Sequence, residues 1–84
     1  MNMSGKSIIK KLSELPVGKQ AIIRSFDQEE ISIKFMEMGI IPGEEIKIEK
    51  VAPLGDPISV LVADYWVSLR LEEAQQIVVE EVIN

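Results

Sequence analysis

Residues 39–51 read Gly-Ile-Ile-Pro-Gly-Glu-Glu-Ile-Lys-Ile-Glu-Lys-Val, and this stretch decides the fold class. After the Pro-Gly turn signal, the alternation of residues puts Ile46 and Ile48 on one face of a strand. The next apolar residue is Val51, which breaks the two-residue phase. A bulge or a strong bend near residues 49–50 would explain the break, and such bends curl small sheets into barrels.

Gly and Pro clusters divide the rest of the chain into short segments. All four prolines lie in three turn-forming clusters, at residues 16–18, 39–43 and 53–57. The segments between them leave no room for the crossovers of roughly a dozen residues that parallel strands need. Strand-like patterns occur at residues 19–26, 45–51, 58–63, 66–69 and 77–83. We therefore predict an all-β (mostly β) fold, a small SH3-like barrel of about five strands with one short α-helix and a helical turn.

The segment at residues 27–39 fits two periodicities, because its apolar residues alternate as in a strand and also repeat at i, i+4, i+7 as in a helix. The ends of the segment favour a helix. Asp27 can act as N-cap with Glu30 three residues later, and Gly39 suits the left-handed position just past a helix end. We predict a helix from Gln28 to Met38.

Two further segments are predicted to form single helical turns. Apolar residues spaced i, i+4, i+7 within residues 8–15, followed by Pro16, indicate the first. Residues 72–76 are predicted to form the second. The chain is predicted to be one domain spanning residues 1–84, in which residues 1–10 are a flexible N-terminal segment.

The composition excludes several classes of function. The chain has 84 residues, of which 46% are hydrophobic and 27% charged, as expected for one small folded domain. It contains no cysteine and no histidine. These two absences exclude disulfides, zinc fingers, Ser-His-Asp catalysis and Cys-His catalysis. We predict a protein that is not an enzyme, with no catalytic residues and no cofactor.

The charge and hydropathy of the chain indicate which partners and which location to expect. The formal net charge is −5, and five of the nine basic residues fall within the first 24 residues. An acidic domain repels the phosphate backbone, so we expect no nucleic-acid partner. The longest apolar run is residues 60–63, and no signal peptide is visible. We expect a soluble, cytoplasmic protein without direct membrane insertion.

Neighbouring carboxylates and aromatic residues have simple structural interpretations. Adjacent residues diverge on a strand or a helix, so the four Glu-Glu pairs are expected to be solvated surface charges, and we predict no metal site. Met38 is expected to pack in the core. Tyr65 and Trp66 must point to opposite faces of a strand, so we expect one in or near the core. The other would mark a partner surface or pack over the barrel rim.

Four motifs follow one another along nearly the whole chain. They are L-S-E-L-P-V-G at 12–18, M-E-M-G-I-I-P-G at 36–43, A-P-L-G-D-P-I at 52–58, and S-L-R at 68–70 followed by Ala74 and Ile77. This ordered set resembles the FeoA family, small cytoplasmic accessory proteins of bacterial ferrous iron transport. The same domain forms the C-terminus of iron-dependent repressors. The chain departs from the family pattern at Lys34-Phe35, where Arg-Leu is usual, and at Asp64, where a hairpin glycine is common.

The resemblance implies a non-enzymatic adaptor that binds the cytoplasmic part of the membrane iron transporter FeoB. Expected contacts are exposed residues of the helix, the turn after it and the tip near residue 55, namely Lys34, Glu37, Ile41, Leu54 and Asp56. Two alternatives stay open: a transition-metal-binding module, and a peptide-binding regulatory domain like that of the repressors. Without histidine or cysteine, the residues favour only weak binding of hard ions such as Mg²⁺ or Mn²⁺. The oligomeric state is left open.

Overall fold

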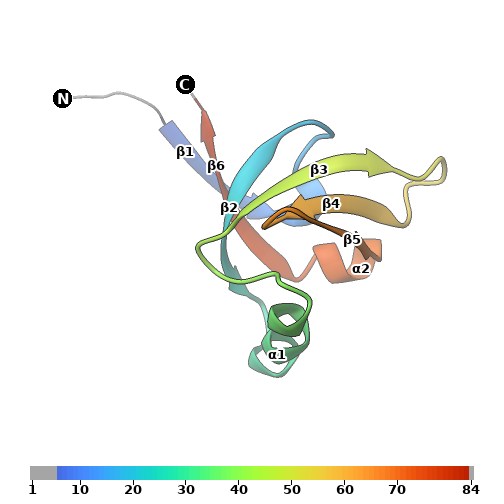
Figure 1. The fold of residues 1–84 in the computed structure, drawn as a ribbon. Coiled ribbons are helices and arrows are strands. Elements are labelled where there is room, and N and C mark those ends of the chain that lie inside the picture. The colour runs from blue at the N-terminus through green and yellow to red at the C-terminus, as the bar shows by residue number, and fades with distance from the viewer. Residues whose placement is uncertain (1–5, 84) are drawn as a thin grey trace.

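The computed structural model describes residues 6–83, which form an antiparallel sheet curled around an apolar core (Figure 1). The strands are β1 (Lys6–Lys11), β2 (Gln20–Phe26), β3 (Glu45–Val51), β4 (Ile58–Val62), β5 (Tyr65–Leu69) and β6 (Ile77–Ile83). The helical elements are the 3-10 turn η1 (Leu12–Glu14), α1 (Glu29–Glu37) and α2 (Leu71–Ala74). The strand order is β1-β6-β2-β3-β4-β5, and every neighbouring pair is antiparallel. The predicted antiparallel barrel architecture is confirmed.

The core is built from alternate residues of the strands. Ile46 and Ile48 of β3 lie beside Val60 and Val62 of β4, and all four side chains are buried. The register between β3 and β4 shifts between Ile48 and Lys50. The predicted bulge is therefore confirmed at the place where the apolar phase breaks, and it turns the sheet around the core.

Helix α1 confirms the helical interpretation of residues 27–39 to within one residue at each end. Phe35 is fully buried and stacks on Phe26 with ring centroids 5.3 Å apart, which fixes the helix against β2. Gly39 has φ +91°, the left-handed conformation predicted for it. The predicted N-cap is wrong, because the helix begins after Gln28 and the Asp27 carboxylate instead accepts a hydrogen bond from Lys11.

The N-terminal part of the chain differs from the prediction. Residues 1–5 lie outside the described residues, but residues 6–10 belong to strand β1 instead of a flexible segment. β1 pairs along its whole length with β6, the most distant strand in the sequence. The predicted helical turn at residues 8–15 shrinks to η1, because Ile8 and its neighbours are taken into the sheet. The sheet therefore has six strands.

The two end strands of the sheet are β1 and β5, which do not pair with each other. Tyr65 and Trp66 of β5 are 70% and 67% exposed, so the expectation that one of them lies in or near the core is wrong. They do point to opposite faces, but β5 reaches the core only through Leu69, which is buried, and Val67, which is partly buried. No helix among residues 6–83 has the length and apolar character needed to cross a membrane.

Candidate functional site

Helix α2 contacts both segments in which the sequence predicts partner contacts, namely α1 and the loop between β3 and β4. Lys34 of α1 donates a hydrogen bond from Nζ to Glu73 Oε2 at 2.8 Å, and the backbone N–H of Arg70 donates to Glu73 Oε1 at 2.8 Å. Both interactions favour the ionised carboxylate. The hydrogen bond from Lys34, followed by that from Arg70, holds the pKa of Glu73 below its usual value. Glu73 thereby connects α1 to the end of β5.

The loop between β3 and β4 contacts the N-terminal end of α2. Asp56 Oδ1 accepts a hydrogen bond at 3.0 Å from the backbone N–H of Leu71, the first residue of the helix. This N–H has no partner within the helix, so Asp56 caps the helix from a distant part of the chain. The Asp56 carboxylate therefore stabilises the fold through this hydrogen bond.

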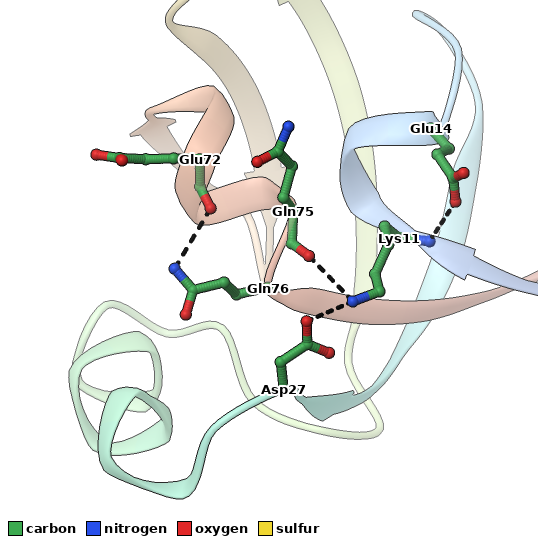
Figure 2. A network of polar contacts seen from close by, with 6 residues as sticks. All are labelled: Lys11, Glu14, Asp27, Glu72, Gln75 and Gln76. Carbon is green, nitrogen blue, oxygen red and sulfur yellow. Dashed lines mark hydrogen bonds and ion pairs between the residues drawn. The ribbon is translucent and has the colours of Figure 1, made fainter.

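A second polar network ties the end of β1 to both helical segments (Figure 2). Lys11 Nζ donates to the carboxylate of Asp27, just before α1, and to the carbonyl oxygen of Gln75 at 3.2 Å, just after α2. The backbone N–H of Lys11 also donates to Glu14 Oε1 at 2.8 Å. A cation at the carbonyl end of a helix is stabilising. These contacts fix how the helices sit on the sheet.

The outward side of α1 carries apolar side chains that nothing else in the described residues covers. Ile33 is 63% exposed and Met36 is 41% exposed, whereas Phe35 faces the core. With successive residues about 100° apart on a helix, Glu29 and Glu37 lie on the same side as these two residues. We call this set the α1 surface; it consists of Ile33 and Met36 with the exposed carboxylates Glu29, Glu30 and Glu37.

The five predicted contact residues fall into three places. Lys34 and Asp56 both contact α2, through different atoms of that helix. Glu37 and Ile41 are exposed at the end of α1 and in the turn after it, while Leu54 is 96% exposed at the tip between β3 and β4. Figure 1 shows that tip and α1 at separate ends of the molecule, so the five residues do not form one surface.

Sequence reasoning missed Ile33 and Met36, which are the apolar part of the α1 surface. The signal that could have found them is helical phase. Once Ile31, Phe35 and Met38 are assigned to the core side, Ile33 and Met36 must point away from it. Met38 is partly buried against the core, as predicted.

The side chains of the barrel do not suit a tightly bound transition metal. Within residues 6–83, no three Asp or Glu side chains gather closely enough to hold an ion, and the chain has no His or Cys. Several carboxylates are already paired with cations, as Glu80 is with Arg24 and Glu81 with Lys10. The available donor set therefore offers isolated oxygen ligands, which suit weakly bound hard ions at most.

The sequence and the fold both match known proteins. A family model described as the FeoA domain matches residues 10–81. The chain belongs to the FeoA family. Among curated proteins, the Fe(2+) transport protein A/Fe(2+) transporter FeoB fusion protein of Porphyromonas gingivalis is 42% identical over 71 residues. That match covers 83% of this chain and 8% of the fusion protein, so the chain spans only a small part of that relative.

Solved FeoA structures share the fold. The FeoA-like protein from Clostridium acetobutylicum is 35% identical with a TM-score of 0.83, over 98% of this chain and 93% of that one. FeoA from Stenotrophomonas maltophilia, solved with zinc and described as a prokaryotic SH3 domain protein, is 31% identical with a TM-score of 0.73. That match covers 86% of this chain and 95% of the other. The predicted SH3-like fold is thus confirmed for this FeoA family member.

The likeness also extends to proteins of a different kind. A manganese-dependent transcriptional repressor matches 90% of this chain and 43% of its own, with a TM-score of 0.79 and 18% identity. At that identity the likeness concerns the fold alone. IdeR from T. acidophilum is similar as well, with 27% identity and a TM-score of 0.74 over 87% of this chain and 34% of its own.

Proposed function

We propose that this FeoA family protein is a non-enzymatic, cytoplasmic adaptor of ferrous iron transport that binds the cytoplasmic region of a FeoB transporter. The observation that carries the proposal is the Porphyromonas gingivalis protein, in which a segment 42% identical to this chain is joined to FeoB in one polypeptide. Covalent joining raises the effective concentration of two modules that act together. A separate chain must achieve the same association through a binding surface.

The α1 surface is the region best suited to that association. Its two apolar side chains, Ile33 and Met36, are surrounded by carboxylates, and Lys34 of the same helix is paired with Glu73. Such a surface is complementary to an apolar patch with a basic rim. Anionic lipid headgroups and nucleic acid would be repelled by the same carboxylates. A protein partner therefore fits the α1 surface better than a membrane surface or a nucleic acid does.

Of the predicted contact residues, Glu37 belongs to this surface, and Ile41 is exposed in the turn after α1. Lys34 contributes by fixing α1 relative to α2 through its 2.8 Å bond to Glu73. Leu54 lies away from α1, at the tip between β3 and β4, where it offers a second exposed contact, while Asp56 supports α2. We assign the main role to α1 because it combines apolar and charged groups on one face.

The proposal is tested by measuring binding of the purified chain to the cytoplasmic region of FeoB from the same organism. The double variant I33E/M36E replaces both apolar side chains of the α1 surface by carboxylates. We expect its dissociation constant to rise by at least about tenfold, which corresponds to about 1.4 kcal/mol, since loss of one apolar anchor at an interface already costs more than about 1 kcal/mol and two are removed. Uptake of Fe²⁺ should fall in cells that carry only this variant.

The matched control is V17E, the same kind of change at an exposed apolar residue. Val17 is 55% exposed and precedes β2, whereas α1 follows the opposite end of that strand. V17E should bind FeoB as the unchanged chain does. Equal loss of binding in both variants, or no binding by the unchanged chain, would contradict the proposal.

A further inference from the structure

The two edge strands of the sheet differ in how well they are protected against pairing with another chain. β1 carries Lys6, Lys10 and Lys11, and lysines on an edge strand discourage pairing with another chain. β5 reads Tyr-Trp-Val-Ser-Leu, with no charged residue and no proline. Its register with β4 is uninterrupted from Val62↔Tyr65 to Ile58↔Leu69, so no bulge twists this edge away. β5 is therefore an open, uncharged edge.

The hairpin sets which backbone groups of β5 face outward. β4 and β5 are joined by the two-residue loop Ala63-Asp64, whose φ angles are +48° and +68°. In an antiparallel hairpin with such a loop, the two residues that close the loop form backbone hydrogen bonds with each other. Every second residue along β5 forms backbone hydrogen bonds with its partner on β4 in the same way. Tyr65, Val67 and Leu69 thus direct their N–H and C=O groups toward β4. Trp66 and Ser68 direct theirs to the free edge.

Opposite charges flank this edge symmetrically. Asp64 lies three residues before Val67, and Arg70 lies three residues after it. Both are exposed, and neither forms an ion pair with another residue in the range 6–83. Arg70 keeps an extended backbone, with φ −74° and ψ 150°, so the chain continues in the direction of the strand past Leu69.

We infer that β5 pairs with β5 of a second copy of this chain, antiparallel about a two-fold axis at Val67. In this register Trp66 of one copy faces Ser68 of the other, and both present their outward N–H and C=O groups to each other. The Asp64 side chain of each copy lies beside Arg70 of its neighbour. The same operation on β1, with the axis at Ile8, would bring Lys6 opposite Lys10, and like charges directly opposite each other are destabilising.

The pairing also covers the exposed aromatic residues. Trp66 of each copy becomes a diagonal neighbour of the other Trp66 on the outer face, within reach of aromatic side chains. On the inner face, Tyr65 lies opposite Leu69 of the other copy. A ladder of five residues makes a small interface, so we expect a weak dimer that forms only at high protein concentration. The inference does not depend on the proposed binding to FeoB.

The test is sedimentation equilibrium of the purified chain up to about 1 mM, a range that detects weak association. The fluorescence of Trp66, the single tryptophan of the chain, provides a second readout. We expect a monomer–dimer equilibrium accompanied by a blue shift in emission. D64R and R70D should each weaken the dimer at least about tenfold, because each reversal creates two like-charge contacts. A 1:1 mixture of D64R and R70D should restore dimerisation, since both contacts are then between opposite charges.

The controls are D64N and R70Q, which remove the charges without reversing them. Each should weaken the dimer less than the reversals do, and their mixture should be rescued only in part, because a mixed dimer regains one of the two ion pairs. A chain that stays monomeric over the whole concentration range would overturn the inference. So would a dimer that neither reversal affects, or a D64R and R70D mixture no better than its components when circular dichroism shows both variants folded.

Discussion

The α1 surface and the β5 edge both leave apolar side chains in water, but they differ in charge. On α1, Ile33 and Met36 are exposed among carboxylates of a single sign. On β5, Trp66 is exposed on an uncharged strand that has Asp64 before it and Arg70 after it. A surface of one sign repels a copy of itself and attracts a basic partner, whereas a surface with balanced charges can be self-complementary. The two regions are therefore suited to different partners.

The largest expected effect comes from truncating Phe35, the side chain that packs α1 against the sheet. Phe35 is fully buried and stacks on Phe26, so F35A should lower the free energy of unfolding by about 3–5 kcal/mol. I33A, a truncation on the outward side of the same helix, should change it by less than about 0.5 kcal/mol. Chemical denaturation of both variants measures the difference. Similar losses in the two variants would mean that α1 is not anchored through Phe35.

A smaller effect is expected in how strongly each of the two associations depends on salt concentration. Raising the salt concentration from about 0.1 M to 1 M shortens the screening length from about 10 Å to about 3 Å. Binding of the FeoB cytoplasmic region through the carboxylates of the α1 surface should weaken about tenfold. Pairing at β5 should weaken less, because its ladder of backbone hydrogen bonds and its aromatic contacts are uncharged. Titrations at the two salt concentrations provide the comparison, and equal salt dependence of both associations would count against it.

A change of about 1 kcal/mol is expected at the remote cap of α2. D56A leaves the N–H of Leu71 without its carboxylate partner, and loss of a helix cap typically costs about 1 kcal/mol. L54A, two residues away at the exposed tip, should be nearly neutral. Thermal unfolding of the two variants tests this. If D56A were as stable as L54A, the hydrogen bond to Leu71 would have no role in the fold.

The smallest effect is a pH dependence at Glu73, which accepts hydrogen bonds from Lys34 of α1 and from the backbone of Arg70 just after β5. Because its pKa is lowered by Lys34 and then by the backbone of Arg70, its contribution to stability is fully present above the ordinary glutamate pKa of about 4.3. That contribution is lost as the pH falls through the lowered pKa of the folded state. The stability difference between the unchanged chain and E73Q should therefore shrink on acidification. A difference that stays constant from neutral to acid pH would contradict the assignment.

The parts of the fold that are encoded locally could be predicted from the sequence. The break in phase at Val51 indicated the bulge in β3, and Gly39 indicated where α1 ends. Strand β1 could not be predicted, because Lys6 and its neighbours are ordered by pairing with residues around Ile83 at the far end of the chain. Its local apolar spacing fitted a helix equally well, and tertiary pairing decided between them.

The candidate site was less predictable than the fold for the same reason. The bond between Lys34 and Glu73 joins residues that are 39 positions apart, and that between Asp56 and Leu71 joins residues 15 apart. No sequence spacing indicates either one. The exposure of both Tyr65 and Trp66 follows from the place of β5 at the edge of the sheet, which depends on strand order rather than on composition.

The most direct test of the central claim is a titration of the isotope-labelled chain with the purified cytoplasmic region of FeoB, followed by amide NMR. We expect saturable shifts that are centred on α1 around Ile33 and Met36, with β5 around Trp66 unaffected by the partner. Binding centred on β5 or on the tip at Leu54, with α1 unchanged, would contradict the claim. Absence of any shift at saturating FeoB would contradict it as well.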